Sequence, residues 1–197
     1  RLTLPNWIPG SYMIRDFSRH VGAIVGTDSD GKTVAVRKLG KSEWQCDPVS
    51  GPLTLRYEVY AWDLSVRGAH LDQTHGFFNG TSVFLAVDGQ EGVPHEVSIE
   101  QPAGVAGDWR VATSLPRLGA APLGFGSYHA ENYDALIDHP VEMGTVTHAV
   151  FTACGVEHEV VITGRHRADM PRLLRDLEQI CSTQIRFFGE PAPFSRY

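Results

Sequence analysis

Hydrophobic and polar residues alternate along several short stretches of the chain, and this pattern predicts β-strands. The clearest stretches are residues 52–62 and 93–100, where every second side chain is apolar. A period of two places the apolar side chains on one face of a sheet, which must then be buried. The same reasoning predicts further strands at residues 19–26, 33–39, 42–46, 82–87, 109–112, 144–151 and 156–163.

The pattern changes to a helical period near the end of the chain. Asp169 can cap a helix, and Pro171 lies where the first turn tolerates proline. The apolar residues that fall at helical spacing in this stretch are Met170, Leu173, Leu174, Leu177 and either Ile180 or Cys181. We predict a helix here, followed by a strand at residues 185–189, and a shorter helical turn at residues 133–138.

These elements predict a mainly β fold. We expect an antiparallel, sandwich-like N-terminal domain over residues 1–164. Residues 165–197 then supply one C-terminal α-helix and a strand that open a second, truncated domain. A helix without the rest of its core would expose an apolar stripe, so we expect it to pack against its own β-domain or a neighbouring molecule.

Composition narrows the class of protein. The 197 residues carry 17 basic and 23 acidic side chains, with a formal charge of -6 and no cluster of Lys or Arg. This balance gives no reason to expect nucleic acid or an anionic membrane as a partner. No apolar run reaches the roughly 20 residues of a membrane-spanning helix, and no signal-peptide pattern is present. We therefore expect a cytoplasmic protein, and since the chain begins with Arg1 we expect the native protein to start earlier.

Residues 4–17 contain proline, glycine and aromatic residues close together. Pro9 restricts the backbone and Gly10 frees it, which indicates a shaped loop after a strand. Trp7, Tyr12 and Phe17 make this loop either an anchored corner of a β-domain or part of a binding wall. The anchored corner is the favoured interpretation.

Motifs for catalysis are incomplete. The pairs His95-Glu96 and His158-Glu159 both lack the second histidine of H-E-x-x-H, and both lie in stretches with the strand period. His70, Asp72 and His75 form the densest group of possible metal ligands, but their spacing matches no motif, and a polar loop is favoured. We therefore assign no metal ligand, cofactor or catalytic residue to this chain.

Residues 77–82, FFNGTS, offer two interpretations. Asn79 and Gly80 fit an ordinary hairpin turn, which is the favoured interpretation. Alternatively, the loop presents the Asn79 amide and the Thr81 hydroxyl to a ligand.

Three segments together resemble the N-terminal region of the bacterial glycyl aminopeptidase family. They are residues 4–17 (LPNWIPGSYMIRDF), 76–82 (GFFNGTS) and 133–144 (YDALIDHPVEMG). The signature residues in the first segment are Trp7, Pro9, Gly10, Tyr12, Arg15 and Asp16.

The resemblance implies a role for the chain within a larger enzyme. Members of that family are zinc metallopeptidases with a PDZ domain and a layout similar to aminopeptidase N, and they remove N-terminal Gly or Ala from peptides. It implies that the zinc and the catalytic machinery lie downstream, and that this chain is a non-catalytic domain supporting and lining the substrate cleft. Its partners would be its own catalytic and PDZ domains and the peptide substrate. The candidates for facing substrate are Asn79, Thr81, Tyr133 and Glu142.

A different class of function stays open beside this one. A stand-alone β-sandwich module could bind a peptide or glycan through Trp7, Tyr12 and Phe78. A self-sufficient hydrolase is disfavoured because H-E-x-x-H is missing.

Overall fold

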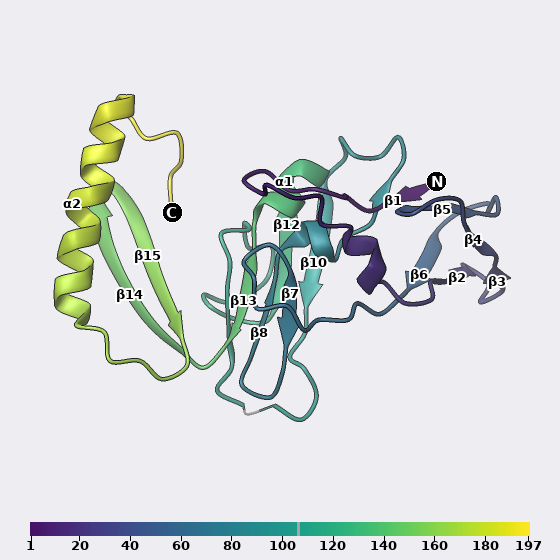
Figure 1. Cartoon of the computed structure of the whole chain (residues 1–197), viewed down its shortest axis with the longest axis horizontal. Coiled ribbons are helices and arrows are strands. Elements are labelled where there is room, and N and C mark those ends of the chain that lie inside the picture. The colour runs from purple at the N-terminus through teal and green to yellow at the C-terminus, as the bar shows by residue number, and fades with distance from the viewer. Residues whose placement is uncertain (106) are drawn as a thin grey trace.

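The computed structural model describes residues 1–105 and 107–197, and the chain folds mainly into antiparallel strands, as predicted (Figure 1). The strands are β1 (Leu2–Thr3), β2 (Val25–Asp28), β3 (Thr33–Val34), β4 (Val36–Lys38), β5 (Glu43–Cys46), β6 (Leu53–Arg56), β7 (Ala69–Leu71), β8 (His75–Phe78), β9 (Ala86–Val87), β10 (His95–Ile99), β11 (Arg110–Ala112), β12 (Gly126–Ala130), β13 (Val141–Gly144), β14 (Val146–Ala153) and β15 (Val156–Thr163). The helices are α1 (Tyr133–Asp138) and α2 (Met170–Phe188), with 3₁₀ turns at Phe17–His20 and Gly80–Ser82. None of these helices is both long and apolar enough to span a membrane.

The strands form small sheets around two apolar clusters. The sheet orders are β4-β5-β1-β9, β3-β2-β6, β11-β13-β8-β7, β10-β12 and β14-β15. One cluster centres on Val111, Tyr128 and Val141, each at most 1% exposed. The other, built around Leu4 and Trp44, holds the N-terminal segment against the first sheet. The chain is therefore sandwich-like, with its sheets stacked over shared cores rather than closed into a barrel.

The sheet β11-β13-β8-β7 has one face in the first cluster. Val111 pairs with Met143, and Val141 pairs with Phe78, and these side chains contribute to the cluster. Since neighbouring residues on a strand point to opposite faces, the residues between them are turned away from the core. That second face carries the site described below.

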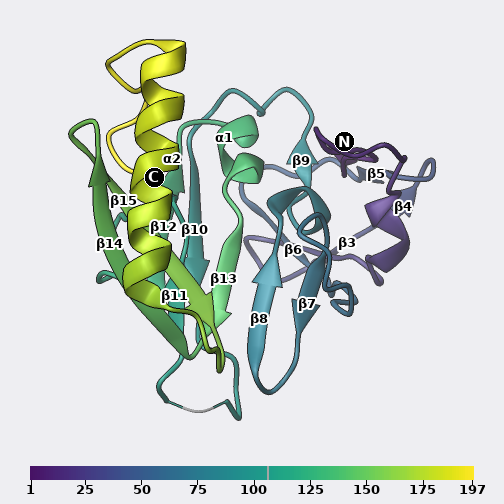
Figure 2. The ribbon, with the colours of Figure 1, turned by 60° about the vertical axis from the view of Figure 1, so that its left-hand side comes forward.

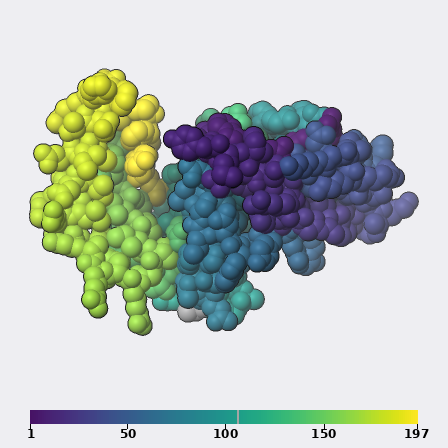
Figure 3. Space-filling model, viewed as in Figure 1, coloured from purple at the N-terminus to yellow at the C-terminus, as the bar shows by residue number. Residues whose placement is uncertain are grey.

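The last part of the chain forms a hairpin–helix unit, which we define as residues 146–197. Strands β14 and β15 pair along their whole lengths, and α2 packs on β14. Figures 1 and 2 show α2 lying over the hairpin, and Figure 3 shows the unit as a lobe at one end of the molecule. The helix begins as predicted, with the Asp169 side chain accepting from the Arg172 backbone N–H. It packs on its own chain, one of the two arrangements expected.

The strand predicted at residues 185–189 is wrong, because residues 185–188 form the last turn of α2 and Gly189 caps it. Ile185 is 8% exposed and continues the buried stripe of the helix, so its packing favours helix over strand. The helix ends at Gly189, whose φ of 103° suits glycine, and whose N–H donates to the Ile185 carbonyl. Phe187 and Phe188 are left exposed beyond this buried stripe.

Three other strand predictions were too long. Of residues 19–26 only Val25 and Gly26 belong to a strand, β2, because the chain before them forms the 3₁₀ turn Phe17–His20. Residues 82–87 reduce to β9, because the backbone before it turns into the 3₁₀ segment Gly80–Ser82. Residues 52–62 reduce to β6, after which the segment stays extended with isolated bridges at Val59 and Trp62. Apolar and polar residues do alternate along this segment. After β6, however, the chain no longer pairs with β2 and forms only single bridges to other segments.

The loop at residues 4–17 is anchored at its ends and open at its tip. Leu4 and Phe17 are buried, and the Arg15 side chain donates to the Ser11 hydroxyl across the loop. Tyr12 and Trp7 are exposed, so the expectation that the aromatic residues close the β-domain holds for Phe17 alone.

Candidate functional site

A row of side chains crosses the open face of the central sheet. The residues opposite one another in the register are Trp62 and His70, His70 and Phe77, Phe77 and Glu142, and Glu142 and Ala112. Residues directly opposed in antiparallel strands project to the same face. The sheet therefore gathers an indole, an imidazole and a phenyl ring from neighbouring segments of the chain, and a carboxylate from β13, which is distant in sequence.

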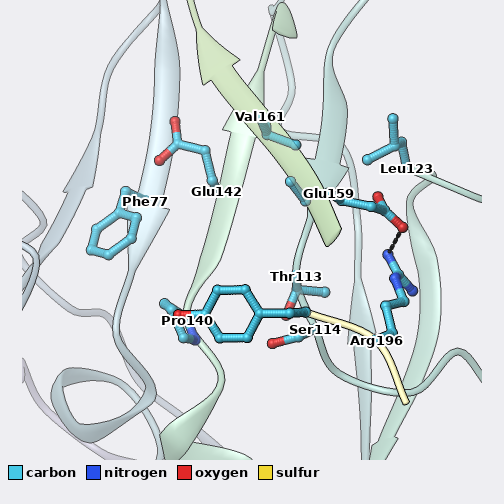
Figure 4. A pocket seen from close by; sticks show the side chains of 11 residues that line it. Phe77, Thr113, Ser114, Leu123, Pro140, Glu142, Glu159, Val161 and Arg196 are labelled. Carbon is cyan, nitrogen blue, oxygen red and sulfur yellow. Dashed lines mark ion pairs between the residues drawn. The ribbon is translucent and has the colours of Figure 1, made fainter. Parts of the chain in front are cut away.

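This open face meets the hairpin–helix unit in two adjoining hollows, which we call the interlobe recess. The first, about 230 Å³, is drawn in Figure 4, with Phe77 and Glu142 on the sheet side and Val161 and Glu159 on β15. The second, about 590 Å³, is lined by Thr74, His75, Glu142 and residues 161–164. Glu142 belongs to both hollows and is the ionisable group at their junction.

Burial in the recess raises the pKa of the Glu142 carboxyl above its usual range. A hydrogen bond with the Thr163 side chain and the charges of His75 and His70 oppose this shift without cancelling it. A cationic or hydrogen-bond-donating ligand would stabilise the charged form of this carboxylate, because the ligand replaces the hydrogen bonds to water that are lost on burial.

The opposite wall of the recess is made by the end of the chain. The Arg196 guanidinium lies 2.6 Å from the Glu159 carboxylate, the ion pair drawn in Figure 4. His148 contacts the other oxygen of Glu159 at 3.0 Å. Residues 196 and 197 are held beside β15 by backbone hydrogen bonds, with Tyr197 N–H donating to the Glu157 carbonyl. This wall places a fixed cation across from Glu142.

Asn79 and Thr81 lie apart from this recess and are buried rather than presented on an exposed turn. The Asn79 side-chain oxygen accepts from the Thr81 backbone N–H and from its hydroxyl, so the two residues cap the 3₁₀ turn. Asn79 has an extended backbone with a φ of -91° and precedes a 3₁₀ segment, so the ordinary hairpin turn favoured from the sequence is not formed here. Both line a third hollow of about 700 Å³ beside Ile8 and Arg67, and this hollow shares no lining residue with the interlobe recess.

Tyr133 acts as a structural tie. It is 5% exposed, and its hydroxyl donates to the Phe84 carbonyl at 2.7 Å. Burial raises the pKa of this phenol far above its usual range. Of the four predicted substrate-facing residues, the structure thus places Glu142 in the interlobe recess, Asn79 and Thr81 in the third hollow, and Tyr133 in the core.

The β7–β8 turn brings together the polar group that the sequence treated as a loop. The His70 Nε2 atom lies 3.1 Å from Asp72 Oδ2, and His75 Nδ1 lies 3.8 Å from Asp72 Oδ1. Hydrogen bonds from Thr74 and from the His75 backbone lower the pKa of Asp72, with Thr74 contributing most. The loop is polar and hydrogen-bonded, as favoured, and its three donor side chains converge.

The recess residues that sequence reasoning missed come from the hairpin and the chain end. Glu159, Thr163 and Arg196 have ordinary sequence surroundings and become neighbours of Glu142 only when the hairpin folds over the sheet. No local pattern signals them.

The chain contains no H-E-x-x-H sequence. Its two His-Glu pairs lie on β10 and β15, where consecutive side chains point to opposite faces, so neither can form the two-histidine face of an H-E-x-x-H helix. We therefore assign no catalytic step to these residues.

Comparison with known proteins identifies the relatives. Residues 1–145 match the family model described as the peptidase M61 N-terminal domain. A crystal structure of an aminopeptidase N family protein from Idiomarina loihiensis superposes with a TM-score of 0.95 and 49% sequence identity. That match covers 100% of this chain and 33% of the other, so the chain spans a third of the length of this relative. None of the curated proteins compared with the chain matches it.

Proposed function

The chain belongs to the peptidase M61 N-terminal domain family, and from this premise we propose that it is the non-catalytic N-terminal part of a zinc metalloaminopeptidase that removes N-terminal Gly or Ala from peptides. Its role is to support the catalytic domain and line one wall of the substrate cleft. The observation that carries the proposal is the 49% identity over the whole chain to one third of an aminopeptidase N family protein.

Within this role, Glu142 is the residue we assign to substrate. Its carboxylate lies in the interlobe recess with a raised pKa, beside the apolar ring of Phe77. A peptide entering the recess by its amino end would bring an ammonium group, which a desolvated carboxylate binds better than water does. Asn79 and Thr81 contribute through the third hollow, where a segment of the same enzyme or substrate would meet them.

The partners follow from the same proposal. They are the downstream catalytic domain, which would supply the zinc, a PDZ domain, and the peptide substrate. The exposed rings of Phe187 and Phe188 at the end of α2 are consistent with cover by a following domain.

The test uses the full-length protein. Reading the gene beyond Tyr197 should show H-E-x-x-H followed by a downstream Glu within the next hundred or so residues. The full-length enzyme should cleave glycyl and alanyl anilides and lose activity with a zinc chelator. A stop codon soon after Tyr197 would end the proposal.

The cleft-lining role has its own variant. Glu142→Gln in the full-length enzyme should raise KM at least tenfold, since a charge-assisted contact to the substrate is lost. Glu96→Gln, exposed on β10, is the matched control and should leave KM unchanged. If both variants had the same KM, the assignment of Glu142 to the substrate cleft would be wrong.

One observation favours a second candidate, a stand-alone module that binds a peptide or glycan. Trp7 and Tyr12 are exposed, as a binding surface requires. Phe78, the third member of the predicted surface, packs edge-on against Phe84 beside the core, which weakens this candidate. Binding of peptide or glycan arrays by the chain, lost in Trp7→Ala, would support it.

A further inference from the structure

The turn between β7 and β8 holds three side chains whose donor atoms converge. One ligand atom from each of His70, Asp72 and His75 lies within 4.8 Å of the other two. Bonds from a tetrahedral zinc ion to nitrogen or oxygen are about 2.0 Å long, which separates neighbouring donors by about 3.3 Å. The pair His70 Nε2 and Asp72 Oδ2, at 3.1 Å, already has this spacing.

The Asp72 carboxylate is oriented by its own hydrogen bonds. Its Oδ1 atom accepts from the Thr74 backbone N–H, the Thr74 hydroxyl and the His75 backbone N–H, at 2.6, 2.7 and 3.0 Å. Metal-binding carboxylates are held in this way, with one oxygen fixed and the other free to ligate. The remaining oxygen, Oδ2, faces His70 Nε2 at 3.1 Å.

His70 is the buried member of the group. Its side chain is 5% exposed and lies between the rings of Trp62, at 4.9 Å, and His75, at 5.0 Å. Its Nδ1 atom is buried and has no hydrogen-bond partner among the described residues. An Nε2–H can donate to the Asp72 carboxylate, which only accepts. When a cation takes the place of this proton, the ring offers the Nε2 lone pair to the cation.

We propose that His70, Asp72 and His75 form a binding site for a divalent transition-metal ion, with zinc as the best fit. Two imidazoles and one carboxylate are a ligand set that zinc accepts, and a water completes the coordination. His75 is the ligand that must adjust, and it is the first residue of β8, next to the turn, with its side chain 24% exposed. On metal binding, the Nε2 proton of His70 moves to Nδ1 or to solvent, so no other reactant is needed.

The position of the site gives it a structural role. His75 lines the interlobe recess together with Glu142 and residues 161–164 of the hairpin–helix unit. An ion at this point fixes the β7–β8 turn and adds a positive charge on the Glu142 side of the recess. The site is built only from residues of this chain and does not depend on the proposed peptidase function.

Calorimetric titration of the metal-free 197-residue chain with Zn²⁺ tests the inference. We expect one ion per chain, and at least tenfold weaker binding in His75→Ala and in Asp72→Asn, because each removes a ligand. Asp72→Asn retains an oxygen for the turn hydrogen bonds, and circular dichroism checks that both variants fold.

His148→Ala is the matched control. His148 also contacts a carboxylate, that of Glu159, but Arg196 occupies the same carboxylate and disfavours a cation. Its affinity for Zn²⁺ should stay within twofold of the unaltered chain. The inference is overturned if the unaltered chain takes up less than one ion, or if His75→Ala and His148→Ala bind alike.

Discussion

Residues 1–145 and the hairpin–helix unit differ in how far their apolar side chains are buried. The first region contains both apolar clusters. Among the described residues, the buried apolar side chains of the second are Ala153 and Ile185, while Ile180, Phe187 and Phe188 are exposed. A region with its own core can be stable alone, whereas a hairpin covered by one helix buries little apolar surface to stabilise it. The interlobe recess lies where the two regions meet, so the less self-sufficient region helps to set its shape.

The largest expected change in the free energy of unfolding comes from a substitution in the core of the first region. Leu115 is 1% exposed, and Leu115→Ala should lower the free energy of unfolding by about 3 kcal/mol, through lost burial and the cavity left behind. Urea denaturation measures it. Leu118→Ala, at a site 59% exposed, should change it by less than about 0.5 kcal/mol. Equal losses would contradict the core we describe.

A smaller and more local effect is expected in the second region. Ile185→Ala removes the buried side chain of the last turn of α2 and should cost about 2 kcal/mol. Because few contacts tie the unit to the rest, the loss should appear as faster proteolysis of α2 rather than as global unfolding. Ile180→Ala, 55% exposed on the same helix, is the control. A purely global loss would show that the two regions unfold as one.

The recess between the regions should respond to pH through Glu142. Its raised pKa means that the folded chain binds this proton more tightly than the unfolded chain does. The resulting stabilisation is present below the usual glutamate pKa of about 4.3 and is lost as the pH rises through the raised value. The stability of Glu142→Gln relative to the unaltered chain should therefore increase from pH 4 to pH 7. Thermal melts across this range measure it, and Glu96→Gln should show no such trend.

The smallest effect on stability is expected at the exposed end of α2. Replacing both Phe187 and Phe188 by Ser should change the free energy of unfolding by less than about 0.5 kcal/mol, because both rings face solvent. The same double variant should reduce self-association in sedimentation velocity, since an exposed apolar patch is removed. A large loss of stability would mean that these rings pack within the chain.

Much of the fold could be predicted from local pattern. The strand β15 and the helix α1 have the predicted bounds, and α2 begins at the predicted cap, Asp169. These elements have strong alternation or clear capping residues. The strand predicted at residues 185–189 failed because a run of apolar residues fits either structure, and in the folded chain Ile185 is buried as part of α2. The domain boundary at residue 164 stays a prediction, although α2 packs on the hairpin that precedes it.

The candidate site could be predicted only in fragments. Glu142, Asn79 and Thr81 were selected through a family resemblance, and the structure places them around two hollows rather than one. The group at His70, Asp72 and His75 was visible as a dense run of donors, but its convergence required a turn whose geometry the Asp72 side chain sets.

The sequence by itself determined the mainly antiparallel strands, the C-terminal helix and the family. Short-range periodicity and capping decide the strands and the helix, since these depend on residues within a few positions of one another, whereas the family followed from the resemblance of three longer segments. Only the tertiary structure decided that Glu142 faces Arg196 across a recess, and that Trp62, His70 and Phe77 share a sheet face with it. These residues become neighbours through the pairing of strands, which depends on their register and on burial of the opposite face of the sheet. A local sequence pattern does not specify which strands pair with each other.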